Sequence, residues 1–91
     1  MNEKVHLIIK GDVQGVGFRF RAIEIARDLG LTGWVKNNPD DSVEIVAEGE
    51  KDALQNLITW SKKGPPVAKV SNLQITWQKA TGEFEAFTVK Y

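Results

Sequence analysis

The stretch GDVQGVGFR, residues 11–19, lies where the spacing of apolar residues changes from every second residue to the 3.6-residue period of a helix. Before it, apolar residues alternate in KVHLIIK, residues 4–10, which predicts a β-strand. After it, apolar residues recur on one helical stripe from Phe18 onward, and Gly30 is a suitable residue to end that helix. The stretch is therefore a strand-to-helix junction, from which the other elements can be read outward.

Downstream of this first helix the pattern predicts two strands, a second helix and two further strands. They are expected over residues 31–37, 42–48, 51–62, 70–77 and 84–91, with turns at residues 38–41 and 79–82. The order β-α-β-β-α-β-β predicts an α+β fold, a ferredoxin-like βαββαβ sandwich with an extra C-terminal strand. Its sheet is expected to be mostly antiparallel, with both helices on one face. At 91 residues, the whole chain, residues 1–91, is expected to form one domain.

Composition excludes several classes of protein. The chain has 12 Lys and Arg residues against 12 Asp and Glu residues, so its net charge of zero argues against a nucleic-acid partner bound mainly through phosphate neutralisation. The absence of cysteine excludes thiol catalysis and a cysteine-based zinc site. The apolar run near the N-terminus is too short for a signal peptide or a membrane-spanning helix, so we expect a soluble cytoplasmic protein with no membrane partner.

The glycines of the 11–19 stretch suggest an anion site. The first amides of a helix lack intrahelical acceptors, and glycines let the backbone approach a ligand closely. The spacing G-x-x-x-G-x-G differs from the dinucleotide fingerprint, and the ending Gly17-Phe18-Arg19 lacks the lysine and hydroxyl of a P-loop. A cation is unfavourable at a helix N-terminus unless an anion lies beside it, which favours an anion between Arg19 and the loop. A purely structural turn with a surface arginine remains the alternative.

Together with GWVKN at residues 33–37, the stretch at 11–19 resembles the acylphosphatase family. The resemblance covers nearly the whole chain, including the hairpin at residues 37–40, GPPVA at residues 64–68 and FTVKY at residues 87–91. It implies the ferredoxin-like sandwich that the periodicity also predicts. It further implies an enzyme that hydrolyses the carboxyl–phosphate bond of acyl phosphates, giving a carboxylate and inorganic phosphate.

The resemblance also implies roles for individual residues. Arg19 and Asn37 are the implied catalytic residues, Asn37 holding the attacking water. The implied substrate-binding residues, which act on the phosphoryl group through loop amides and the arginine, are Gln14, Gly15, Val16, Gly17, Phe18 and Arg19. The chemistry fits, because arginine offers a planar fork of donors to phosphoryl oxygens and asparagine can both accept and donate hydrogen bonds. The roles require the end of the 31–37 strand to face the start of the first helix.

No general base is evident in the sequence. His6 is the only histidine and lies in the first predicted strand, away from the loop, while Asp12 is expected to be solvated. We therefore expect the phosphoryl oxygen of the substrate to accept the proton of the water. No cluster of His, Asp or Glu has ligand spacing, so no metal and no cofactor are predicted. The expected partner is a small-molecule acyl phosphate, with phosphate as product or inhibitor, and the protein is expected to be a monomer.

Two other functions share parts of this pattern. RNA-recognition modules have the same layout, but they need aromatic residues on strands that here, at residues 4–10 and 42–48, have none. A non-catalytic anion-binding or phosphate-binding domain would keep the loop without turnover.

The turn at residues 38–42 departs from the family, because Asp41 stands where a glycine is often found. We expect Asp41 to adopt a left-handed backbone at a small local cost. The type of this turn stays open at this point. Four large aromatic residues are expected to be buried in the core or to pack as half-buried residues: Trp34, Trp60, Trp77 and Phe87.

Overall fold

The structure is a computed structural model that describes residues 2–91. It contains two helices and five strands in the predicted order. Their bounds are β1 Asn2–Asp12, α1 Phe18–Asp28, β2 Thr32–Asn37, β3 Val43–Glu50, α2 Lys51–Ser61, β4 Lys69–Lys79 and β5 Phe87–Val89. No helix in this part of the chain is long and apolar enough to cross a membrane.

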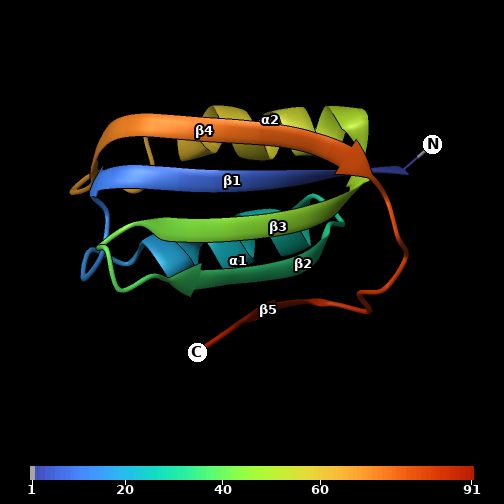
Figure 1. Cartoon of the computed structure of the whole chain (residues 1–91), viewed down its shortest axis with the longest axis horizontal. Coiled ribbons are helices and arrows are strands. Elements are labelled where there is room, and N and C mark those ends of the chain that lie inside the picture. Colours follow the sequence, from blue (N-terminus) through green and yellow to red (C-terminus); the bar gives the residue numbers. More distant parts are fainter. Residues whose placement is uncertain (1) are drawn as a thin grey trace.

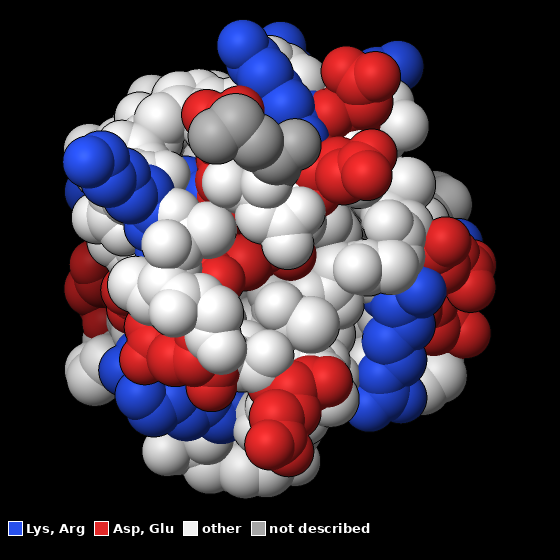
Figure 2. Space-filling view, turned by 90° about the vertical axis from the view of Figure 1, so that its right-hand side faces the viewer, with Lys and Arg blue, Asp and Glu red and all other residues white. Residues whose placement is uncertain are grey.

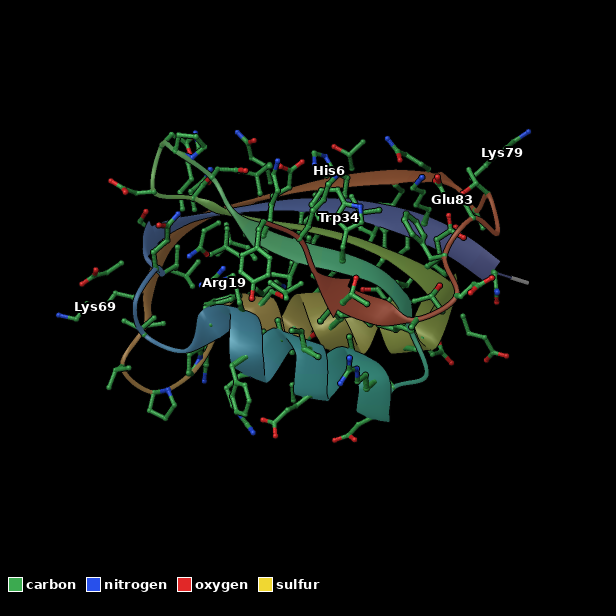
Figure 3. The ribbon with its side chains drawn as sticks, turned by 90° about the horizontal axis from the view of Figure 1, so that it is seen from below. His6, Arg19, Trp34, Lys69, Lys79 and Glu83 are labelled. Atoms are coloured by element: carbon green, nitrogen blue, oxygen red, sulfur yellow. The ribbon has the colours of Figure 1, made fainter. Side chains whose placement is uncertain are left out.

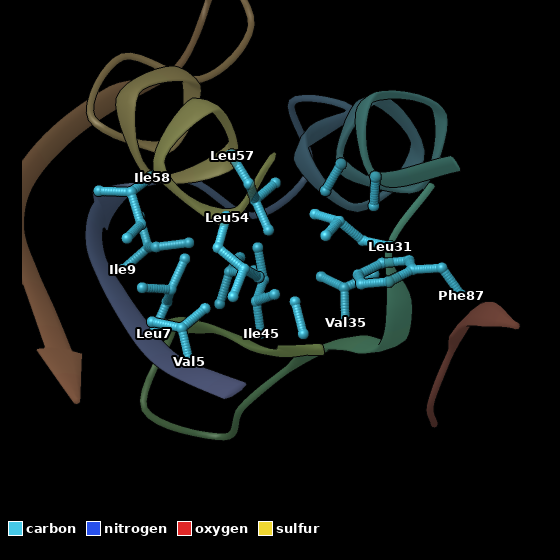
Figure 4. Packing of buried hydrophobic residues seen from close by; sticks show 14 of the residues in the cluster. Val5, Leu7, Ile9, Leu31, Val35, Ile45, Leu54, Leu57, Ile58 and Phe87 are labelled. Atoms are coloured by element: carbon cyan, nitrogen blue, oxygen red, sulfur yellow. The ribbon is translucent and has the colours of Figure 1, made fainter. Parts of the chain in front are cut away.

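The five strands form one sheet in the order β4-β1-β3-β2-β5 (Figure 1). The pairs β4–β1, β1–β3 and β3–β2 are antiparallel, whereas β5 joins the edge of β2 as a parallel strand. Both helices cover the same face of the sheet (Figures 1 and 4). The predicted ferredoxin-like α+β fold, with one extra strand after the βαββαβ unit, is therefore confirmed.

The hydrophobic core fills the space between the sheet and the two helices (Figure 4). Alternate residues of β1 point toward the helices and are fully buried: Val5, Leu7 and Ile9. Leu54 and Leu57 of α2 are also fully buried. Each such side chain stabilises the fold by about 1.5–3 kcal/mol relative to exposure, so these layers fix the helices on the sheet.

The topology brings the ends of β1 and β2 to the same edge of the molecule. Both strands pair antiparallel with β3, which lies between them, so they run in the same direction. Asp12, Asn37 and the start of α1 therefore gather at one end of the sheet (Figure 1). The requirement that the end of the second strand face the start of the first helix is met.

The prediction of a final strand over residues 84–91 was too long, because β5 contains only Phe87–Val89. Since β4 and β5 lie at opposite edges of the sheet, residues 80–86 must cross the end of the sheet between them (Figure 1). Glu48 anchors this crossing: its Oε2 accepts hydrogen bonds from the amide and hydroxyl of Thr81 at 2.9 and 2.7 Å, and its Oε1 accepts from the Gly82 amide at 2.9 Å. Residues 84 and 85 are used in the crossing, and contact with β2 begins where the Ala86 carbonyl accepts a hydrogen bond from the Gly33 amide at 2.9 Å.

The turn after β2 has the conformation expected for Asp41. Its φ of 72° lies in the left-handed region, and it is the one non-glycine residue among residues 2–91 with a positive φ. Asp40 closes the turn, because its Oδ1 accepts hydrogen bonds from the amide and hydroxyl of Ser42 at 3.0 and 2.6 Å. These bonds, the hydroxyl's above all, hold the pKa of Asp40 below its ordinary value.

The aromatic residues lie largely as predicted. Phe87 is buried, and Trp34 and Trp60 are half-buried, the latter with its ring centre 5.0 Å from that of Phe18. Trp77 lies on the edge strand β4 and is 38% exposed. Phe87 is therefore part of the core and Trp60 packs against it, whereas Trp34 and Trp77 lie outside the core cluster.

Candidate active site

The loop between β1 and α1 contains two exposed glycines in a left-handed conformation. Gly15 and Gly17 have φ values of 72° and 80°, a left-handed conformation that side chains disfavour. A Cβ added at either glycine would meet nothing within 4 Å, so the backbone angle and not lack of space requires glycine there. Backbone in alternating right- and left-handed conformations points successive amides into a concavity that suits an anion.

The amides of this loop are free to bind a ligand. Gly17 is the N-cap of α1 and makes no side-chain capping bond, and the first turn of the helix contains no acidic residue. Within residues 2–91, none of the amides of residues 15–19 donates to a backbone carbonyl outside the regular elements, whereas the Arg21 amide donates to the Gly17 carbonyl at 3.1 Å. The partial positive charge of the helix N-terminus is therefore uncompensated at this point.

Gly11 is required for a different purpose from Gly15 and Gly17. The prediction that all three glycines of residues 11–19 serve an anion site is therefore wrong for Gly11. It lies at a shift of register between β1 and β4, with a φ of 129°. A Cβ at this position would lie 2.1 Å from the carbonyl oxygen of Lys69. Gly11 is needed for the close approach of two strands, and only Gly15 and Gly17 shape the loop.

Arg19 is the arginine whose side chain has no acceptor among residues 2–91. Arg21 donates to Glu24 at 2.6 Å, and Arg27 donates to the Phe87 carbonyl at 3.1 Å. Within residues 2–91 Arg19 forms no ion pair or hydrogen bond through its side chain, and its guanidinium carbon lies 5.8 Å from the centre of the Tyr91 ring. Its donors are thus available to a bound anion.

Asn37, the last residue of β2, carries an unusual polar atom. Its Oδ1 is buried and has no hydrogen-bond partner among residues 2–91. Buried polar side-chain atoms in folded proteins nearly always have a partner. Ser61 Oγ on α2 is likewise unpaired among residues 2–91, but of the two only Asn37 lines the hollow described below, where a ligand or water can reach it.

These groups line one hollow of about 310 Å³ at the end of the sheet. Its residues come from the loop, α1, the ends of β2 and β5, and the segment after β5: Val13, Gly15, Gly17, Phe18, Arg19, Phe20, Ile23, Asn37, Val89 and Tyr91. Figure 3 shows Arg19 at the start of α1, on the helix side of the sheet. The structure thus brings Arg19 and Asn37 together, as the sequence predicted.

The side chains of three loop residues are used elsewhere. Val16 packs against the core, and Phe18 is buried. Gln14 lies outside the lining of the hollow and donates from Nε2 to the carbonyls of Asn38 and Ser42 at 2.8 and 2.9 Å. These residues can therefore contribute to an anion site mainly through their backbone amides.

The Gln14 contact was not predicted from the sequence. It joins the glycine loop to the turn that follows Asn37, and so fixes the two sides of the hollow relative to each other. The one indication in the sequence is a long amide side chain in a loop of small residues, which needs partners if it is half-buried.

His6 is remote from this hollow. It lies on the opposite side of the sheet from the helices, and its Nε2 is 2.6 Å from Glu44 Oε2 (Figure 3). Among residues 2–91 no group of three or more His, Cys, Asp or Glu side chains is arranged to hold a metal ion.

Comparison with known proteins identifies the family. The acylphosphatase family model matches residues 5–89. An acylphosphatase of Pelotomaculum thermopropionicum is 43% identical over 97% of this chain and 96% of its own length, and one of Methylococcus capsulatus is 46% identical over 96% and 95%. The crystal structure of acylphosphatase from Bacillus subtilis superposes with a TM-score of 0.94 at 38% identity, covering 100% of both chains. The chain therefore belongs to the acylphosphatase family, and its activity is the hydrolysis of acyl phosphates.

Proposed function

We propose that the hollow holds the phosphoryl group of an acyl phosphate between Arg19 and the amides of residues 15–19, with Asn37 placing the attacking water. The observation that carries this assignment is the meeting of three unpaired features in one hollow of about 310 Å³. They are the loop amides without a backbone acceptor, the Arg19 side chain without an acceptor among residues 2–91, and the unpartnered Oδ1 of Asn37.

The reaction then needs little more than positioning. The water oxygen attacks phosphorus, the bond from phosphorus to the acyl oxygen breaks, and the carboxylate leaves with the electron pair. The charge on the phosphoryl oxygens in the transition state is stabilised by the Arg19 guanidinium and the loop amides. The Oδ1 of Asn37 accepts a hydrogen bond from the water and orients its lone pair toward phosphorus.

The proton of the water goes to a phosphoryl oxygen of the substrate. None of the residues that line the hollow is His, Asp or Glu, so no side chain there is suited to act as a general base. Because the carboxylate is a good leaving group and Arg19 supplies positive charge, we propose that the reaction runs without a metal ion.

We also propose that the substrate is a free small molecule and that the protein works as a cytoplasmic monomer, without a nucleic-acid or membrane partner. The end of the molecule opposite the hollow carries acidic and basic side chains interspersed, with no large patch of one sign (Figure 2). This pattern and the net charge of zero give no support to binding along a polyanion.

The test is hydrolysis of benzoyl phosphate with and without EDTA. We expect turnover well above the spontaneous rate, unchanged by chelation; loss of activity with EDTA would contradict the metal-free mechanism.

Replacing Arg19→Ala is expected to reduce kcat/KM by about 10²–10³-fold, as removal of such a donor usually does. Arg21→Ala, next but one along the helix and paired with Glu24, is the matched control and should retain activity. Tight phosphate binding without turnover would favour the non-catalytic anion-binding alternative.

A further inference from the structure

The hollow has a second part that the phosphoryl group does not need. Beyond Arg19, Asn37 and the glycines, its lining is apolar: Val13, Phe18, Phe20, Ile23, Val89 and Tyr91. Two of these side chains are unusual because they are not taken up by the core. Phe20 is 67% exposed and Tyr91 is 98% exposed, although both are large and aromatic.

Exposed aromatic side chains grouped at a concave site indicate a binding surface more often than those scattered over a protein. Phe20 follows Arg19 in the first turn of α1, and Ile23 lies about one turn further on. The ring of Tyr91 lies against the Arg19 guanidinium from another part of the chain. The apolar surface therefore begins directly beside the group expected to hold the phosphate.

The charges around the hollow restrict what this surface can accept. Arg19 is the one residue of the lining with a charged side chain. A carboxylate or ammonium group on the acyl part of a ligand would find no further charged side chain there and would lose hydration on entering. An uncharged apolar group, in contrast, is favoured by contact with Phe20 and Ile23.

We infer that Phe20, Ile23 and Tyr91 form a subsite for an uncharged, apolar acyl group, and that Phe20 makes the enzyme favour ring-containing acyl groups over the smallest ones. This inference rests on the proposed function, because it takes the phosphoryl group to be held at Arg19. The volume of about 310 Å³ is at the lower end for small-molecule sites. The subsite therefore suits a group the size of one ring and not a long chain.

The first test compares two substrates. The ratio of kcat/KM for benzoyl phosphate to kcat/KM for acetyl phosphate is measured in the wild type, Phe20→Ala, Phe20→Leu and Val67→Ala. We expect Phe20→Ala to lower the ratio about 2- to 10-fold, the range given by loss of one aromatic contact, and Phe20→Leu to lower it less. Val67 is 66% exposed and lies outside the hollow, so Val67→Ala should leave the ratio unchanged.

The second test measures binding alone, by calorimetry with phenylphosphonate and methylphosphonate. We expect phenylphosphonate to bind more tightly to the wild type, and Phe20→Ala to remove most of that difference. If the protein prefers phenylphosphonate but turns over no acyl phosphate, the catalytic proposal is wrong and the proposed subsite is still supported. Turnover with the same substrate ratio and the same pair of affinities in Phe20→Ala and wild type would overturn the subsite.

Discussion

The side-chain Nε2 of Gln14 lies 2.8 Å from the carbonyl oxygen of Asn38, and this hydrogen bond ties the glycine loop to the turn after β2. A second bond from the same nitrogen to the Ser42 carbonyl, at 2.9 Å, makes the tie bidentate. Asn37 immediately precedes this turn, and Arg19 is the second residue of α1, which follows the loop directly. The bonds of Gln14 therefore help to set the distance between the two proposed catalytic residues.

Replacing Gln14→Ala is therefore expected to lower kcat by ~10-fold or more, since misplacement of a reacting group by about 1 Å can reduce the rate ~10²-fold. Steady-state kinetics with benzoyl phosphate measure the change. Gln55→Ala, on the exposed face of α2, is the matched control. A loss of thermal stability with kcat intact would show that Gln14 supports the fold and not the geometry of the site.

Replacing Asn37→Ala separates water placement from phosphate binding. We expect kcat to fall about 10²-fold, because the water loses its orientation. The inhibition constant of inorganic phosphate should stay within about threefold, because Arg19 and the loop amides remain. Asn56→Ala on the exposed surface of α2 serves as control. If phosphate inhibition weakens as much as turnover, Asn37 is a binding residue and its proposed role is wrong.

The two kinds of glycine in the 11–19 stretch predict two different effects. Gly15→Ala has space for its methyl group, so it should destabilise the fold by only the ~1–2 kcal/mol of a left-handed residue while weakening phosphate binding. Gly11→Ala adds a clash with the Lys69 carbonyl, which raises the expected loss by roughly another 1–3 kcal/mol. Urea denaturation of both variants measures the free energies of unfolding. Equal losses would mean that the strands β1 and β4 separate at Gly11 without difficulty.

Glu48 predicts how stability depends on pH. Burial favours the neutral form of its carboxyl, but hydrogen bonds from Thr81 and Gly82 and the charge of Lys4 outweigh this and lower its pKa. Its contribution to stability is therefore complete above its ordinary pKa in the unfolded chain, and it is lost as the pH falls through the lower pKa of the folded state.

We expect Glu48→Gln to destabilise the protein by roughly 1–3 kcal/mol at pH 7, since an ionised acceptor is lost. It should also weaken the fall in stability on acidification, measured by urea denaturation from pH 7 to pH 3. Some acid dependence will remain, because Asp40 and Glu83 also have lowered pKa values, through hydrogen bonds with Ser42 and Lys4 respectively. The exposed Glu50→Gln is the control. If the free energy of unfolding of Glu48→Gln falls as steeply between pH 7 and pH 3 as that of the wild type, Glu48 does not cause the acid dependence.

The order of elements could be predicted from the sequence because the period of apolar residues and the turn residues are local properties of the chain. The pairing of Arg19 with Asn37 was implied only by the resemblance of two motifs to the acylphosphatase family, since no local property of the sequence brings these two residues together. The partners of Gln14 could not be predicted, because they are backbone carbonyls whose positions depend on how the turn at residues 38–42 folds against the loop.

The errors have the same origin. Gly11 was assigned to the loop because the group that requires a glycine there, the Lys69 carbonyl of β4, is far away in the sequence. The apolar residues from Phe84 onward predicted one long strand, but the chain must first cross from one edge of the sheet to the other before Phe87 can pair with Gly33. The spacing of apolar residues within a segment does not show which distant strand will approach it or how many residues a connection between two strands needs.

The short parallel strand β5 has a consequence for when the enzyme becomes active. Only three residues of β5 pair with β2, yet Val89 and Tyr91 complete the same hollow as Gly15 and Gly17 near the beginning of the chain. A chain in which β5 has not yet paired with β2 has its phosphate loop but an unfinished hollow. Acyl phosphates therefore meet a complete hollow only after these distant parts of the sequence have folded together.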